Sequence, residues 1–532
     1  MQSGNALGKE GKKFVFDRAW LEKDLGKYPA KLHAHRVAHE LGVNRGIIYL
    51  PGQDSKYYDD SDMGPRFRQR RHFYYVSGAD FPGCVVTYDI ARDHLVLWIP
   101  HVEPRTVLYF GRLPGIEECK AASDLDDVRP IEGLDKALAD LLKDGDTLYT
   151  LHSDQVPKVA EGAPVYVDTS SLLRAADNAR VVKTEYEVEV IRRANHISSE
   201  AHRALLSRLS TFTNEREIDA QFIASCTAHG APTQSYPLIV ASGINASILH
   251  YDENNQTLTD GRQFLVIDGG AEFRCYASDI TRTLPLYPSP SSSSSSSSPF
   301  PSPKAEAIYR LVERMQEECI ERVRPGVLYV SLHRHAAEVA VDGLLKLGLL
   351  KAESAAEVLA QGTVAAFFPH GLGHHIGLEV HDVAGDERLY MSVAGSSTAR
   401  GAGRRGRGKR EYVPPTAMAA LFSDHDDPTV TATTTTTPAA DKKPYQALRP
   451  NMILTIEPGI YFCREYIEGN FLSNPSHARF IDRDVLDTYW DVGGVRIEDD
   501  ILVTKDGYEN LTAAPKGDAM LEEIARGRRV GE

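Results

Sequence analysis

The sequence contains few cysteines and no long apolar run. The cysteines are widely spaced and form no C-x-x-C pair; they are Cys84, Cys119, Cys226, Cys275, Cys319 and Cys463. A disulfide scaffold and a zinc ribbon are therefore not indicated, and we expect reduced thiols. No stretch reaches the roughly 18 apolar residues of a membrane span, and the N-terminal MQSGNALGKEGKKFVFDRAW lacks the apolar core of a signal peptide. The sequence predicts a cytoplasmic protein without membrane contacts.

Basic residues are also fewer than acidic residues. The 532 residues include 60 Lys and Arg against 74 Asp and Glu, a formal net charge of −14. Such a chain repels polyanions and anionic membranes unless its basic residues cluster, so nucleic-acid binding is not expected. Hydrophobic residues make up 42% and charged residues 25%, as in globular proteins. The length exceeds the roughly 250 to 300 residues of one core, which indicates two folded units.

Two stretches lack the apolar residues that a core requires. The first runs from about Pro288 to Pro303 around the serines Ser291 to Ser298, and we expect a flexible surface loop. The second, at about 394–443, combines RGAGRRGRGKR with the threonines Thr433 to Thr437. Its length predicts an insertion, either disordered or a gene-model error. Arg- and Gly-rich segments can bind RNA, but a solvated inserted loop is the favoured interpretation.

Residues 1–180 alternate helix and strand signals, which predicts a smaller α/β domain. Pro29 to Leu41 has the apolar spacing of a helix. Strands are expected at 46–52, at 72–78 and 83–90 as a pair around Pro82, and at 94–100, 146–154 and 164–170. This part contains no Gly-rich phosphate loop. The boundary is indicated by Thr184-Glu185-Tyr186-Glu187, a capping-box pattern that opens a long amphipathic helix.

Residues 181–532 separate helices from strands and are predicted to form an α+β domain. A second amphipathic helix is expected around residues 308–319, with Pro325-Gly326 as its stop. The expected strands lie at 237–243, 263–270, 275–286, 452–462 and 493–504. Because helices and antiparallel-looking strands do not strictly alternate, a parallel sheet is not indicated.

Carboxylates occur within several of these apolar strands. Asp268 ends the run FLVID, and Asp279 lies in the next strand segment beyond Gly269-Gly270. A buried carboxylate without a partner costs several kcal/mol, so such groups need a cation. In MILTIEP, Glu457 lies opposite the apolar face, and in GGVRIEDD, Arg496 and Glu498 do the same. The two aspartates alone could equally be turn or capping residues.

A histidine-rich segment makes that simpler interpretation less satisfactory. PHGLGHHIGLEVHD contains His370, His374, His375 and His381 in a stretch too Gly-rich for a helix. It is not H-E-x-x-H, which excludes the helical single-zinc motif. Four carboxylates with an imidazole form a mostly oxygen ligand set, suited to two ions such as Mn²⁺. A hydroxide bridging two such ions attacks carbonyl carbons, so the set favours hydrolysis.

In the contexts VIDGGAEFRCYASDITRT, HGLGHHIGLEVHD, LTIEPGIY and GVRIEDD, these residues resemble a known family. They are similar to the proline-specific metallopeptidases, aminopeptidase P and prolidase, of the pita-bread fold. FRQRRHFYYVSG, at residues 67–78, resembles a segment of the creatinase-like N-terminal domain of that family. The likeness covers nearly the whole chain apart from the two low-complexity stretches. It implies a C-terminal pita-bread domain preceded by a smaller α/β domain.

The resemblance also implies a role for each residue. The implied metal ligands are Asp268 on one ion, His374 and Glu457 on the other, and Asp279 and Glu498 as bridges. The implied catalytic residues are His250 lining the substrate pocket, His370 and His381 at the scissile carbonyl and prolyl side, Glu457 as proton acceptor, and Arg496 as support. His375 matches no catalytic position of the family and is interpreted as structural.

The implied activity is that of an Xaa-Pro aminopeptidase, with Mn²⁺ as cofactor and peptides with an N-terminal Xaa-Pro as substrates. Prolidase, an Xaa-Pro dipeptidase, is the alternative, because the interval from Glu457 to Glu498 is similar to that of eukaryotic prolidases. The arginine that reads a dipeptide carboxylate, however, is replaced around Lys442-Lys443. A non-catalytic binding module is the remote alternative, and all five ligands argue against it. A homodimer would follow family habit.

Overall fold

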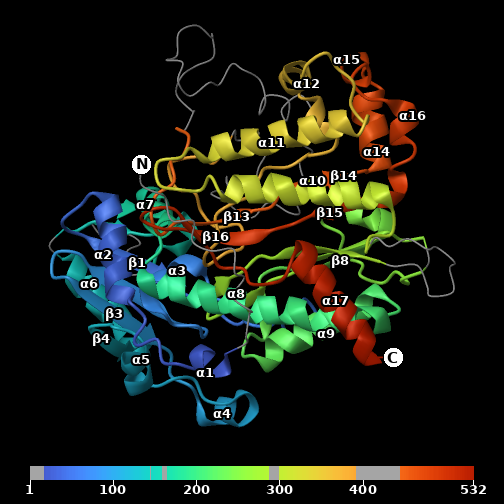
Figure 1. Cartoon of the computed structure of the whole chain (residues 1–532). Helices are drawn as coiled ribbons and strands as arrows, with labels where there is room; N and C mark the ends of the chain where they lie inside the picture. Colours follow the sequence, from blue (N-terminus) through green and yellow to red (C-terminus); the bar gives the residue numbers. More distant parts are fainter. Residues whose placement is uncertain are drawn as a thin grey trace, which may run out of the picture.

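A six-stranded mixed sheet organises the N-terminal part, residues 17–181 (Figure 1). The computed structural model describes residues 17–143, 145–158, 165–259, 261–286, 299–390 and 444–531. In sheet order the strands are β4 (Asp127–Pro130), β3 (His94–Ile99), β2 (Val85–Asp89), β1 (Ile47–Pro51), β5 (Leu148–Tyr149) and β6 (Val167–Asp168). The helices are α1 (Arg18–Leu21), α2 (Ala30–Leu41), α3 (Arg71–Ser77), α4 (Pro104–Phe110), α5 (Ile116–Ala122), α6 (Leu134–Leu142) and α7 (Ser171–Val181). The predicted α/β character of this part is confirmed.

Side-chain alternation along β1 explains why helices cover both faces of this sheet. Ile47 and Tyr49 join a core cluster with Leu138 of α6. Ile48 and Leu50 point the other way, into a cluster with residues of α2, α3 and α7. That second cluster also contains Tyr276 and Ile453 of the C-terminal part. The two parts of the chain therefore share buried apolar surface.

The strand expected at residues 72–78 is wrong, because this segment is helix α3. Phe73, Tyr74, Tyr75 and Val76 favour strands by composition, but all four are buried. Burial on every side removes the alternation that distinguishes the two structures, so tertiary packing decides. Gly78 then ends the helix in the left-handed region, at φ 68°. The strands expected at 146–154 and 164–170 are present as two-residue strands.

The predicted capping box begins α8 (Glu185–Leu206), the long helix that opens the C-terminal part. The Thr184 hydroxyl accepts from the backbone of Glu187, and the Glu187 carboxylate accepts from the backbone of Thr184. The other helices of this part are α9 (Glu215–Ala228), α10 (Pro303–Ile320), α11 (Tyr329–Lys346), α12 (Ala355–Gln361), α14 (Arg464–Ile467), α15 (Pro475–Ala478), α16 (Arg483–Leu486) and α17 (Gly517–Gly531).

Four small antiparallel sheets lie between the long helices. Their strands, in sheet order, are β12 (Thr281–Pro285), β9 (Phe264–Asp268) and β8 (Ile239–Ser242); β13 (Ile453–Ile456), β16 (Asp499–Val503) and β17 (Tyr508–Asn510); β14 (Gly459–Tyr461) and β15 (Gly494–Arg496); and β11 (Tyr276–Ala277), β10 (Ala271–Phe273) and β7 (Thr233–Gln234). Figure 1 shows α10 and α11 on one side of these strands and α8 and α9 on the other. The predicted α+β arrangement is confirmed.

The low-complexity stretches fall mostly outside the described residues. Of the loop predicted at 288–303, the structure describes 299–303, where Phe300 is buried against Phe264 and Tyr309. Pro303 already begins α10, so the end of this segment belongs to the core, which corrects that part of the prediction. The stretch at 394–443 lies outside the described residues.

All six cysteines are unpaired, and five are buried. Among the described residues, none of the helices has the length and apolarity to cross a membrane.

Candidate metal centre

Strand ends and one irregular loop bring the predicted ligands together. Asp268 ends β9, opposite Thr281 of β12, and Asp279 lies just before β12. Glu457 follows β13, and Glu498 lies between β15 and β16. The amide of Glu498 donates to the carbonyl of Thr281 at 3.1 Å, which places this glutamate beside the β9–β12 pair.

The loop that carries His374 is attached to β13 by its backbone. The amide of Thr455 donates to the carbonyl of His374 at 2.9 Å, and the amide of His374 donates to the Thr455 hydroxyl at 3.0 Å. The His374 ring then lies between two carboxylates: its Nε2 is 3.4 Å from Asp279 Oδ2 and 3.4 Å from Glu457 Oε1. Ligand atoms of Asp279, His374 and Glu498 all lie within 4.8 Å of one another. The structure thus gathers these residues at one point.

The tautomer of His374 suits a metal ligand. Its Nδ1 lies 3.0 Å from the carbonyl of His375, which can only accept a hydrogen bond. The proton of the neutral ring is therefore on Nδ1, and Nε2 presents a lone pair toward the carboxylates. Burial lowers the pKa of His374, which favours this neutral form.

Tyr236 connects the two aspartates and was missed by the sequence analysis. Its hydroxyl lies 2.6 Å from Asp268 Oδ1 and within hydrogen-bonding distance of Asp279 Oδ1. A single phenolic proton can serve only one of these oxygens at a time, so the two carboxylates compete for it. Nothing in the segment QSYP distinguishes this tyrosine from an ordinary loop residue.

Arg496 forms hydrogen bonds to Asp268 and to two hydroxyl groups next to the carboxylates. Its Nη2 donates to Asp268 Oδ2 at 2.6 Å, its Nη1 to the Tyr461 hydroxyl at 3.0 Å and its Nε to the Thr281 hydroxyl at 3.2 Å. The Thr281 hydroxyl in turn donates to Glu498 Oε2 at 2.6 Å. Thr281 could have been found from the sequence, because it shares a strand face with Asp279 in DITRT. No sequence pattern of this kind pointed to Tyr461.

The carboxylates carry more negative charge than this one arginine can balance. Burial and the neighbouring Asp268 raise the pKa of Asp279 well above its ordinary value. Burial raises the pKa of Glu457 and Glu498 in the same way, Glu457 being affected by Glu498 and Glu498 by Asp279. Crowded carboxyl groups resist losing their protons at the same time. Bound divalent cations balance the negative charge and so allow all of them to ionise. The donor set therefore fits a pair of divalent metal ions.

This charge crowding predicts an unusual pH dependence for metal-free protein. A carboxyl with a raised folded pKa keeps its proton where the unfolded chain has lost it, so folding stability falls as pH rises above about 4. Below about pH 6.5 the buried histidines with lowered pKa, such as His370 and His374, oppose this trend. We therefore expect the unfolding temperature of chelator-treated protein to decrease as pH rises from about 7 to 9, and added divalent metal to reverse the decrease. Thermal unfolding with and without metal measures this. A metal-free unfolding temperature that rises over that range would contradict it.

The remaining predicted histidines surround the carboxylates. His370 Nδ1 lies 2.7 Å from the carbonyl of Gly371, so Nε2 accepts from the Tyr461 hydroxyl at 2.9 Å. Burial, and then Arg496, lower the pKa of His370 to about 3, with a smaller effect from His250. His381 is exposed and its ring meets that of His374 edge-on, with centroids 4.3 Å apart. His375 is buried against Gln446, as expected for a structural residue.

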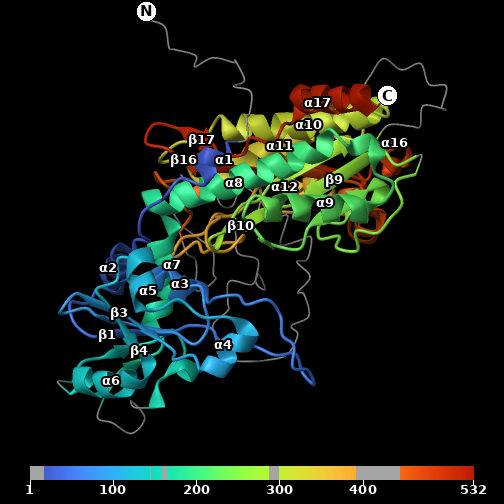
Figure 2. The same ribbon diagram turned by 90° about the horizontal axis from the view of Figure 1, so that it is seen from below.

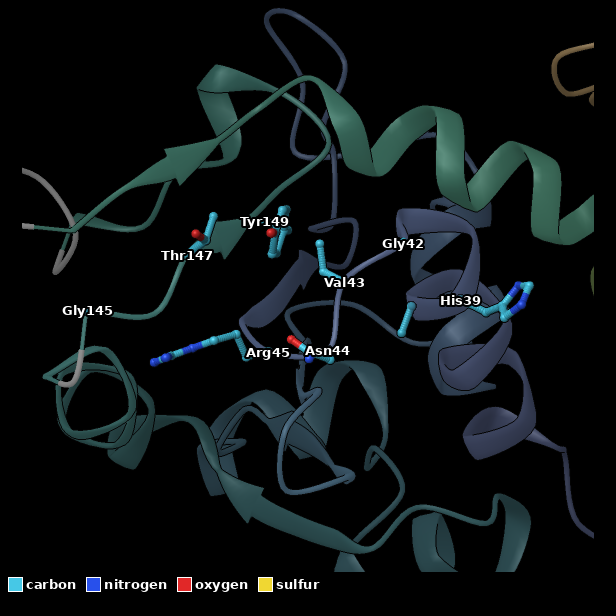
Figure 3. Close-up of a pocket in the computed structure, with 9 residues that line it drawn as sticks. His39, Gly42, Val43, Asn44, Arg45, Gly145, Thr147 and Tyr149 are labelled. Carbon is cyan, nitrogen blue, oxygen red and sulfur yellow. The ribbon is translucent and has the colours of Figure 1, made fainter.

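Two cavities differ in their relation to this centre. One of about 480 Å³ is lined by Tyr236, which hydrogen-bonds to Asp268, and by Asp219 and Asp252, but by none of the predicted ligands. Another of about 850 Å³ is lined by residues between Ala38 and Tyr149 of the N-terminal part (Figure 3). None of the predicted site residues lines that second cavity, so it is not part of the candidate metal centre.

Family comparisons agree with the geometry. Residues 189–410 and 417–505 match the metallopeptidase family M24, and residues 31–149 match the aminopeptidase P N-terminal domain. The chain belongs to metallopeptidase family M24. The M24 chain is 53% identical over 537 residues to a probable Xaa-Pro aminopeptidase of Chaetomium globosum, covering 94% of this chain and 84% of that one. It is also 53% identical to a probable Xaa-Pro aminopeptidase of Colletotrichum graminicola, covering 94% and 92%.

Solved structures show the same architecture. The M24 chain is similar to aminopeptidase PepP of Pseudomonas aeruginosa, with a TM-score of 0.69, 27% identity, and 94% of this chain and 99% of that one covered. Proline aminopeptidase P II of Yersinia pestis gives a TM-score of 0.69 at 25% identity, with 94% and 100% covered. The pita-bread fold with an N-terminal α/β domain, predicted from the sequence, is therefore confirmed.

Proposed function

We propose that this protein is a metal-dependent Xaa-Pro aminopeptidase, which releases the first residue of peptides with proline second. The observation that carries this proposal is the gathering of Asp279, His374 and Glu498 within 4.8 Å, with further carboxylates beside them. The names of relatives that are 53% identical over most of the chain support the same activity. We further propose a boundary between the two domains near residue 180, a cytoplasmic location and a homodimer.

The metal centre that we propose contains two divalent ions, most suitably Mn²⁺ given the oxygen-rich donors. Its ligands would be Asp268, Asp279, His374, Glu457 and Glu498. Such ions, when bound, would lower the pKa of a coordinated water molecule and polarise the scissile carbonyl. Arg496 and Tyr236 would hold the aspartates in place through the hydrogen bonds described above.

The side chains of the protein supply the remaining steps. Glu457, ionised when metal is bound, can accept a proton from the attacking water and deliver it to the departing proline nitrogen. His370 is held neutral between Gly371 and Tyr461, so it can present a fixed dipole at the site. His250 and His381 are exposed, which suits contact with the substrate.

The second candidate is an Xaa-Pro dipeptidase with the same metal centre. The position on which that alternative depends, around Lys442-Lys443, lies outside the described residues. A lysine there would keep the charge of the prolidase arginine but lose its two-point contact with a carboxylate. The relatives that are named aminopeptidases favour the first candidate.

Product analysis with Mn²⁺ separates the candidates. We expect a tripeptide with proline in second position to release its first residue, and the corresponding Xaa-Pro dipeptide to react more slowly. A peptide with alanine in second position serves as the substrate control. Chelation should abolish the reaction, and returned Mn²⁺ should restore it. Turnover confined to the dipeptide would instead identify a dipeptidase.

A further inference from the structure

The loop that carries His381 is tied to the N-terminal part by ion pairs. Between residues 377 and 386 the chain forms neither helix nor strand, so no backbone ladder fixes its shape. This stretch contains three acidic residues, and each pairs with a cation from before residue 184. The pairs are Glu379 with Arg68, Asp382 with Arg180 and Lys183, and Asp386 with Arg174.

The innermost of these pairs is next to His381 in sequence. Asp382 Oδ2 lies 2.9 Å from Lys183 Nζ, and its other oxygen accepts from Arg180. The side chains of Asp382, Lys183 and Arg180 are only 1%, 1% and 2% exposed. The amide of Asp382 also donates to the carbonyl of His375 at 2.9 Å. The residue that follows His381 is therefore fixed through both its side chain and its backbone.

Arg180 lies on α7, and this helix belongs structurally to the N-terminal part. It packs along α2, and Ala175, Ala176 and Ala179 of α7 contribute to the core cluster under the N-terminal sheet. Figure 2 shows α3 and α7 on the side of the N-terminal part that faces the C-terminal part. Arg180 is thus presented to the loop by a helix that is packed into the N-terminal part.

A second anchor lies two residues before His381. Arg68 makes a two-point contact with Glu379, from Nη2 to Oε2 at 2.7 Å and from Nη1 to Oε1 at 3.2 Å. Arg71 extends this anchor, because its Nε is 3.6 Å from Glu379 Oε1 and its Nη2 pairs with Glu272. His381 is therefore bracketed by Glu379 and Asp382, both held from the N-terminal part.

We propose that the N-terminal part positions His381 for the reaction, with Arg68, Arg180 and Lys183 as positioning residues that act through Glu379 and Asp382. The His381 ring meets the ring of His374 at 89°, so a shift of the loop moves it relative to the metal centre. Displacement of a reacting group by about 1 Å can lower a rate by roughly 100-fold. The inference rests on the proposed peptidase function, which its test must address separately.

The test uses variants that leave the fold intact. Arg68→Met and Glu379→Gln act at a pair whose side chains are 52% and 37% exposed, so neither leaves a deeply buried charge. Lys183→Met removes one cation from Asp382 while Arg180 remains. Arg112→Met is the matched control, because Arg112 makes the same kind of two-point contact with Glu118 within the N-terminal part.

We expect Arg68→Met and Glu379→Gln to lower kcat for a proline-second tripeptide by roughly 5- to 10-fold, with little change in KM, metal content or unfolding temperature. Lys183→Met should lower kcat to a similar extent and, because Lys183 and Asp382 are both buried, should also lower the unfolding temperature. The double variant Arg68→Met with Glu379→Gln should be no slower than either single variant, because both remove one contact. Arg68→Lys should recover part of the loss. Arg112→Met should match the wild type.

Three outcomes would overturn the inference. An unchanged kcat in the Arg68 and Lys183 variants would show that His381 needs no such support. In Arg68→Met or Glu379→Gln, a fall in kcat accompanied by an equal loss of bound metal or of unfolding temperature would show a purely structural role. An equal fall in Arg112→Met would show that any lost ion pair has this effect. A wild-type protein that binds metal but cleaves no proline-second peptide would instead refute the proposed function.

Discussion

Asp279→Asn is expected to abolish peptide hydrolysis, lowering kcat by on the order of 10³-fold or more. Asp279 lies among the other proposed ligands, with its carboxylate 3.4 Å from His374 and hydrogen-bonded to Tyr236. An amide has a similar shape but no negative charge, so it cannot bridge two cations. Loss of a metal removes several kcal/mol of transition-state stabilisation, and each 1.4 kcal/mol corresponds to about tenfold in rate.

The same substitution should have the opposite effect on metal-free stability. Removing one charge from a crowded carboxylate cluster relieves repulsion, so chelated Asp279→Asn should unfold at a higher temperature than chelated wild type near pH 8. Asp342→Asn is the control, because Asp342 lies on α11 and pairs with Lys346 at the surface. Metal content, kcat and thermal unfolding test both effects. Retained activity in Asp279→Asn would refute the assigned site.

Most residues of the candidate site could be proposed from the sequence because they follow strand periodicity. Asp279 and Thr281 share a face in DITRT, and Arg496 and Glu498 share one in GGVRIEDD. Antiparallel pairing then brings these faces together, as the bridge between Thr281 and Glu498 shows. Strand periodicity therefore contains the information about these ligands, and the resemblance to a family supplied their roles.

Tyr236 and Tyr461 could not be predicted because their partners are distant in sequence. Tyr461 lies between His370 and Arg496, which only the tertiary fold brings together. The error at residues 72–78 has a related cause. Complete burial of α3 removes the polar face on which the distinction between helix and strand depends. Local patterns thus fail where several elements pack around one segment.

Arg496→Met is expected to destabilise the metal-free protein by about 3 to 5 kcal/mol, because it leaves the buried Asp268 carboxylate without its cation. Arg496 is 4% exposed, and its contacts reach Asp268, Tyr461 and Thr281 at once. Bound metal would supply the missing positive charge to Asp268. The stability difference between variant and wild type should therefore shrink when Mn²⁺ is present.

Arg496→Lys tests whether the loss of stability comes from the lost positive charge or from the lost hydrogen bonds of the guanidinium group. An ammonium group can approach Asp268 but cannot also reach Tyr461 and Thr281 in the same fixed geometry. We expect its stability to lie between those of Arg496→Met and wild type, whereas kcat should fall in both variants because Tyr461 no longer holds His370. Denaturant unfolding with and without metal, together with kcat, tests this. Metal-free Arg496→Met as stable as wild type would show that Asp268 needs no cation, which the crowding of carboxylates argues against.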